Sequence, residues 1–184
     1  MWRQLGAELV ECDVPYSVQD YRLCVRLIGQ PESLSIHEAD LRERHAEMGK
    51  ALREKLMGSL AMRASDYIRA TRWRREIAAA TDRAIAACDA VICAGTMLPT
   101  PRFDDEAATI EYMSASATSV FNASGHPALI QCMGFDARGL PLSLQVAGRY
   151  FDEPTVLRVA AAYEAATPWR QPRPTVRAKE AALT

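Results

Sequence analysis

The stretch Phe121-Asn122-Ala123-Ser124-Gly125-His126-Pro127-Ala128-Leu129 decides the fold of this chain of 184 residues. Gly125 permits a backbone angle that other residues rarely adopt, and Pro127 sets the entry into a strand. We therefore predict a structural turn here, followed by a strand over residues 128–133. A second strand over residues 141–147 follows a segment rich in Gly and Asp, and this order predicts a β-hairpin.

Helices are predicted on both sides of this hairpin. Residues 152–168 open with an Asp and a Pro and close with Thr-Pro, as a helix with defined ends does. Upstream, Ser65 and Asp66 are expected to cap a helix whose apolar stripe extends to Cys88. A charged, periodic stretch over residues 35–57 predicts one half-exposed helix or a pair of them.

Two further strands are predicted nearer the amino terminus. Residues 90–94 form a short apolar run, which is typical of a strand buried on both faces. Residues 9–14, closed by Pro15 and preceded by Gly6, predict a strand that follows the end of a helix. The stretch 99–118 is expected to be a loop or a short helix. Helices that alternate with strands in this way indicate an α/β fold.

Composition excludes several classes of protein. A hydrophobic fraction of 49% is enough to bury a core, and 22 basic against 23 acidic residues give no bulk field for nucleic acid or acidic membranes. The five cysteines form no Cys-x-x-Cys pair and fit neither a disulfide framework nor a zinc site. Because no apolar run is long enough to span a bilayer, a cytoplasmic protein is expected.

Residues 1–170 are expected to form one structural unit, and residues 171–184 are expected to form a loose tail.

Two polar clusters have both a functional and a plain structural interpretation. His37 and His45 lie further apart than recognised zinc ligands and have no third partner, so no metal or other cofactor is expected. Basic side chains with Trp73 occur over residues 69–75 and could contact RNA. A solvated helix face explains them better, so nucleic acid is not an expected partner.

The stretch 121–129 resembles, in order and spacing, the carboxy-terminal block of the amidase signature family, which includes the A subunit of glutamyl-tRNA amidotransferase. The resemblance continues through residues 134–135, 139–141, 144–149 and 151–153, and upstream through residues 5–10, 14–15, 58 and 65–67. It implies the carboxy-terminal part of the family's α/β fold, with a mixed sheet flanked by helices. It also implies amide cleavage as the chemistry.

The resemblance places the family's catalytic groups upstream of the matched region. These are a nucleophilic serine, a second serine in a cis peptide and a lysine base, which must be kept neutral by burial or by neighbouring positive charge. Lys50 and Lys55 lie among charged residues, and Lys179 lies in the tail. A Gly-Ser-rich stretch that supplies the nucleophile and oxyanion donors does not occur. We therefore assign no catalytic residue to this chain and expect it to be inactive alone.

Substrate binding is the one site function that the resemblance implies for this chain. It puts residues 114–122 near the substrate cleft, so Ser116, Thr118 and Asn122 are candidates to line a pocket for a small-molecule amide. An ordinary polar loop is the competing interpretation.

Three functional hypotheses remain open. The leading one is a carboxy-terminal fragment of an amidase that acts on non-peptide carbon–nitrogen bonds. The second is a non-catalytic module that associates with itself or with an upstream amidase half, because an incomplete sheet leaves open edges. The third is an independent hydrolase that uses Ser124 and His126, although the chain has no Gly-x-Ser-x-Gly elbow.

Overall fold

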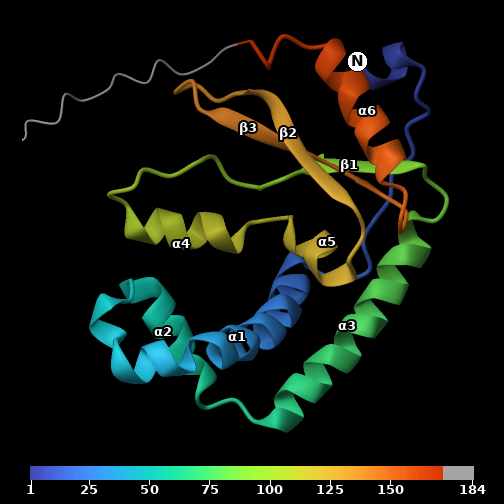
Figure 1. Cartoon of the computed structure of the whole chain (residues 1–184). Helices are drawn as coiled ribbons and strands as arrows, with labels where there is room; N and C mark the ends of the chain where they lie inside the picture. The colour runs from blue at the N-terminus through green and yellow to red at the C-terminus, as the bar shows by residue number, and fades with distance from the viewer. Residues whose placement is uncertain (172–184) are drawn as a thin grey trace, which may run out of the picture.

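The computed structural model describes residues 1–171, which form a three-stranded sheet with helices on both faces (Figure 1). The strands are β1 (Ala90–Ala94), β2 (Ala128–Phe135) and β3 (Pro141–Gly148), in the order β1-β3-β2. Both strand pairs are antiparallel. The α/β class and the predicted hairpin are confirmed, with β2 two residues longer than expected because its ladder continues past a bulge near Gly134.

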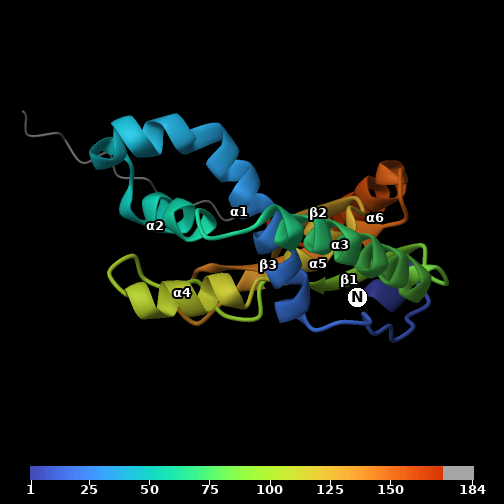
Figure 2. The same ribbon diagram turned by 90° about the horizontal axis from the view of Figure 1, so that it is seen from below.

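The helices and 3-10 turns surround this sheet in chain order. They are η1 (Trp2–Leu5), α1 (Val18–Glu43), η2 (His45–Glu47), α2 (Lys50–Ser59), α3 (Ala64–Ile85), α4 (Glu106–Ser114), α5 (Ser119–Ser124) and α6 (Glu153–Ala165). In Figure 1, α6 covers one face of the sheet, and α1, α3 and α5 lie beyond the other. Figure 2, seen from below, shows α1, α3 and α5 grouped together, with α4 set apart on one side.

The first long helix begins at Val18, well before the stretch 35–57 in which helix was predicted. Ser17 and Asp20 form a reciprocal capping box there, in which each side chain accepts a hydrogen bond from the other's backbone N–H. Pro31 lies inside the helix without ending it. The prediction of a pair of helices is confirmed by α1 and α2, but the signal that starts α1 was missed.

The strand predicted over residues 9–14 is wrong, because these residues pair with no other strand of the described chain. They run along α3, where the Cys12 thiol donates to the carbonyl oxygen of Ala84 at 3.2 Å. Val14 packs against the core. The end of the preceding helix was predicted correctly, since Gly6 closes η1 with a φ of 87°.

Two other predictions need adjustment. Helix α3 begins at Ala64, so Ser65 lies inside it, while the Asp66 carboxylate accepts a hydrogen bond from the Arg63 N–H at 3.1 Å. Strand β1 is an edge of the sheet and its residues are half-buried, rather than buried on both faces. The tail predicted from Gln171 falls almost entirely in residues 172–184, outside the described residues.

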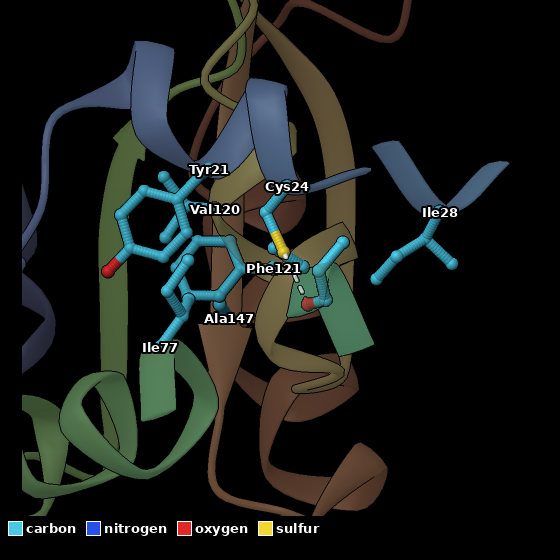
Figure 3. Close-up of a cluster of buried hydrophobic side chains, with 9 residues drawn as sticks. Tyr21, Cys24, Ile28, Ile77, Val120, Phe121 and Ala147 are labelled. Atoms are coloured by element: carbon cyan, nitrogen blue, oxygen red, sulfur yellow. Dashed lines mark hydrogen bonds between the residues drawn. The ribbon is translucent and has the colours of Figure 1, made fainter. Parts of the chain in front are cut away.

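The hydrophobic core lies on both faces of the sheet. On one face, Val146 of β3 packs with Val156 and Tyr163 of α6. On the other, Ala147 of β3 joins a cluster of buried side chains from α1, α3 and α5 (Figure 3); these include Tyr21, Cys24, Ile28, Ile77, Val120 and Phe121. Burying side chains of this size contributes roughly 1.5–3 kcal/mol each. Short helix α5 is thereby fixed between α1, α3 and the sheet.

Within residues 1–171, no helix combines the length and the apolar character needed to cross a bilayer.

Candidate substrate-lining site and the α5–β2 corner

The three predicted substrate-binding residues lie on and just before α5. Ser116 and Thr118 are half-buried, and their side-chain oxygens lie 2.7 Å apart in a hydrogen bond. Asn122 is exposed, whereas the other residues of α5 are buried, namely Ser119, Val120, Phe121, Ala123 and Ser124. The core therefore holds α5 so that Asn122 presents a donor and an acceptor to solvent.

A backbone ladder ties the approach to α5 to the end of β1. The Ala117 N–H donates to the carbonyl oxygen of Gly95 at 3.1 Å, and the Met97 N–H donates to that of Ala115 at 3.1 Å. Thr96 and Ser116 face each other in an isolated antiparallel bridge. Ser116 thus continues the sheet beyond β1 and does not belong to a free polar loop.

A cavity of about 380 Å³ lies next to this ladder, between α4 and the β2–β3 hairpin. Its lining includes Thr96, Leu98, Tyr112, Ile130, Cys132 and Ser143. Ser116, Thr118 and Asn122 are not among the lining residues, although Thr96 directly faces Ser116. The predicted residues therefore flank the cavity without forming it.

The turn of the β2–β3 hairpin contacts Thr100, which lines the cavity. The Arg138 guanidinium donates to the carbonyl oxygen of Thr100 at 2.6 Å and also pairs with the Asp136 carboxylate at 2.9 Å. Hydrogen bonds to Asp136 from the backbone N–H of Leu140 and from Arg138 hold the pKa of its carboxyl below the ordinary value. Arg138 therefore joins the hairpin turn to the loop after β1.

The corner between α5 and β2 contains three side chains joined by hydrogen bonds, of which Ser124 and His126 are buried and Asp82 is half exposed. The His126 Nδ1 lies 2.9 Å from the Ser124 hydroxyl, and its Nε2 lies 3.3 Å from the Asp82 carboxylate on α3. The Tyr150 ring stacks on the imidazole at 4.0 Å between centroids. These residues recreate the composition of a Ser-His-Asp triad.

The burial of Ser124 and His126 argues against nucleophilic catalysis by this set of side chains. Ser124 is 4% exposed and His126 is 5% exposed, so a substrate carbonyl has no approach to the hydroxyl. Ser124 also lies at the carboxyl end of α5, where the helix presents carbonyl oxygens rather than the N–H donors that a developing oxyanion needs. The arrangement therefore supports the predicted structural turn better than an independent hydrolase.

Two further side chains cap α5 at this corner. The Arg74 guanidinium donates to the carbonyl oxygen of Ala123 at 2.9 Å, and the Tyr150 hydroxyl donates to that of Ser124 at 2.8 Å. Both satisfy carbonyls that a helix end leaves unpaired. Burial raises the pKa of Tyr150, and the nearby Asp82 charge adds to this. The tyrosine therefore stays neutral and able to donate at ordinary pH.

Asp82, Arg74 and Tyr150 were not predicted as parts of this corner. They lie far from Ser124 in the sequence, so the spacing of residues does not predict that they meet it in the fold. Arg74 belongs to the basic cluster over residues 69–75, and it is exposed but also donates a hydrogen bond to α5. Trp73 packs against the core, as its place in the apolar stripe predicted.

The histidines considered for a metal site do not meet. His37 Nδ1 lies 3.6 Å from the Asp40 carboxylate on the surface of α1, and His45 lies in η2 beyond the end of that helix. In the part of the chain that the structure describes, no three His, Cys, Asp or Glu side chains gather around a possible ion.

Comparison with known protein families gives one match over most of the chain. The family model described as Amidase matches residues 6–157. An amidase from Pseudomonas putida is 32% identical over 180 residues, which cover 94% of this chain and 38% of that protein. The A subunit of the glutamyl-tRNA(Gln) amidotransferase from Thermosynechococcus vestitus is 38% identical over 112 residues, or 59% of this chain and 23% of that protein.

Solved structures agree in fold. An amidase crystal structure superposes with a TM-score of 0.80 and 24% identity, over 89% of this chain and 39% of the other. The 6-aminohexanoate cyclic dimer hydrolase superposes with a TM-score of 0.74 and 19% identity, over 94% of this chain and 40% of the other. The chain thus spans less than half the length of the proteins that it matches.

Proposed function

Because this chain belongs to the amidase family, we propose that it is the carboxy-terminal portion of an amidase acting on non-peptide carbon–nitrogen bonds, with the catalytic residues outside it. The observation that carries this proposal is the extent of the match. Almost all of this chain corresponds to 38% of the Pseudomonas putida amidase. A portion of that size needs the remainder of the fold to complete its sheet and its cleft.

The chemistry of the available side chains supports the absence of a catalytic centre. Lys50 and Lys55 are exposed, and Lys50 lies 4.0 Å from the Glu54 carboxylate, so neither lysine occupies a buried site. Ser124, whose hydroxyl lies 2.9 Å from His126 Nδ1, is buried. Lys179 lies outside the described residues.

The role proposed for this chain is to supply one wall of the substrate cleft. Asn122 is held by a buried helix while its own side chain stays exposed, which suits a residue that binds an amide carbonyl or N–H. Ser116 and Thr118 add hydroxyl groups at the entrance to the same helix. The substrate class is a small-molecule amide.

The second candidate is a non-catalytic module that pairs with another chain. Strands β1 and β2 are the two edges of the sheet, and within residues 1–171 neither has a partner on its outer side. Open edges favour pairing with a further strand, from a second copy or from an amidase half. We also propose a cytoplasmic location, since all five cysteines are free.

A mixing experiment tests the leading proposal. The chain is assayed against a panel of simple amides, alone and together with the separately produced part of the Pseudomonas putida amidase that it does not match. Cleavage by the mixture but by neither part alone is the expected result. Cleavage by this chain alone would overturn the proposal.

In an active mixture, Asn122→Ala should raise KM more than it lowers kcat, whereas Asn122→Asp tests the need for a donor at the same position.

A further inference from the structure

We propose that the outward face of α4, formed by Ala107, Ile110 and Met113, is the surface through which this chain docks onto the rest of the amidase fold. The inference rests on the proposed function and names the contact that the function requires.

Helix α4 carries apolar side chains on two sides. On the inner side, Ala108 and Tyr112 are half-buried, and Tyr112 lines the cavity against the hairpin. On the outer side, Ile110 is 60% exposed and Met113 is 55% exposed, three residues apart and therefore on one face. A helix that is apolar on both sides is normally covered on both sides.

In the part of the chain that the structure describes, no segment covers this outer face. None of the nine residues of α4 is buried. Figures 1 and 2 both place α4 at one side of the molecule, away from α3 and α6. Met97 and Phe103, in the loop that leads to α4, are exposed as well. The segment 97–113 thus exposes four large apolar side chains, and exposed apolar surface of this kind often marks an interface.

The open edge of the sheet lies beside this segment. Ile130 of β2 lines the same cavity as Tyr112 and is 47% exposed. Because β2 is a sheet edge, a partner that adds a strand there also reaches α4 across the cavity. The docking surface therefore joins an apolar helix face to a strand edge.

The comparisons favour the remainder of the amidase fold as the occupant. The amidase that superposes with a TM-score of 0.80 contains about two and a half times the matched length, since only 39% of it is covered. That additional polypeptide belongs to the same chain as the region that superposes on this one. An apolar face could also pair with its own copy about a two-fold axis, so a second copy of this chain is an outcome that the test distinguishes.

The test uses the full chain and a charge-introducing pair of substitutions on the outer face. Ile110→Glu with Met113→Glu is compared with Leu157→Glu, which places a charge on α6 at a residue with similar exposure, 57%. Circular dichroism checks that each variant is folded. Sedimentation velocity then measures binding to the unmatched part of the Pseudomonas putida amidase.

We expect the wild type and Leu157→Glu to bind, and the Ile110→Glu, Met113→Glu variant to bind at least tenfold more weakly. Equal binding by all three would overturn the assignment of this surface while leaving the proposed function standing. Failure of the folded wild type to bind would contradict the proposed function and this inference together. A concentration-dependent dimer of the chain alone, abolished by the double substitution, would show that a second copy covers the face and would overturn the choice of occupant.

Discussion

The imidazole Nε2 of His126 lies 3.3 Å from the Asp82 carboxylate, and this contact joins the α5–β2 corner to α3 across 44 positions of sequence. The same ring accepts or donates a hydrogen bond at Ser124 through Nδ1. Tyr150 covers the ring and hydrogen-bonds the same corner. A motif that looks like a hydrolase triad therefore holds the helix that presents Asn122.

His126→Ala should destabilise the chain by about 2–3 kcal/mol, because it leaves a cavity and removes a partner from the buried Ser124 hydroxyl. Urea unfolding followed by circular dichroism measures the change. His37→Ala is the matched control, since that ring lies on the surface of α1. Similar midpoints for both variants would show that the corner contributes nothing to the fold.

Asp82→Asn should cost less than about 1 kcal/mol, because the carboxylate is half exposed and the amide oxygen keeps an acceptor in place. The same unfolding experiment applies. A loss as large as that of His126→Ala would mean that the charge on Asp82, rather than its hydrogen bond, supports the corner.

Gly148→Ala should destabilise the chain by about 1–3 kcal/mol through overpacking. A Cβ at this position would lie 2.6 Å from Val156 Cγ2, where β3 meets α6. Gly29→Ala in α1 is the control, since nothing lies within 4 Å of its Cβ position, and it should stabilise the helix by about 0.5–1 kcal/mol. Thermal unfolding of the two variants should therefore shift in opposite directions, and a higher Tm for Gly148→Ala would refute the packing described here.

Stability should fall as the pH rises above about 10, partly because of Tyr21. Burial raises the pKa of this tyrosine, so its hydroxyl ionises first in the unfolded chain. The contribution of neutral Tyr21 is complete below the unfolded pKa and is lost as the pH rises through the folded one. Urea midpoints at pH 8 and pH 11 measure the loss.

Tyr21→Phe isolates this contribution. The Thr81 hydroxyl donates to the Ile77 carbonyl oxygen, so the Tyr21 hydroxyl donates to Thr81 at 2.7 Å. Removing it should cost about 1 kcal/mol at pH 8 and should reduce the further loss at pH 11. An alkaline loss identical to that of the wild type would exclude Tyr21 as its source.

Elements with a local signal were predictable from the sequence. The hairpin follows from two apolar runs around a turn whose Asp136 side chain accepts two backbone N–H groups. Helix α6 follows from Asp152, whose carboxylate accepts from the Thr155 N–H at its start. Each of these signals acts within a few residues, which is why position in the sequence was enough.

Features that depend on distant partners were not predictable in the same way. Residues 9–14 have the composition of a strand, yet no strand of the described chain lies alongside them. The exposure of Asn122 and the burial of Ser124 depend on how α5 packs, although the two residues are close in sequence. The hydrogen bond between His126 and Asp82 likewise depends on the packing of α3, and no periodic pattern in the sequence predicts it.

A fluorophosphonate probe, which labels reactive serines, tests whether this chain contains a catalytic serine. The purified chain is incubated with the probe, its intact mass is measured, and any adduct is located by peptide mapping. We predict an unchanged mass, and in an active mixture a label on the other polypeptide alone. A single adduct on Ser124, or on any other serine of this chain, would show that the chain has a reactive nucleophile of its own.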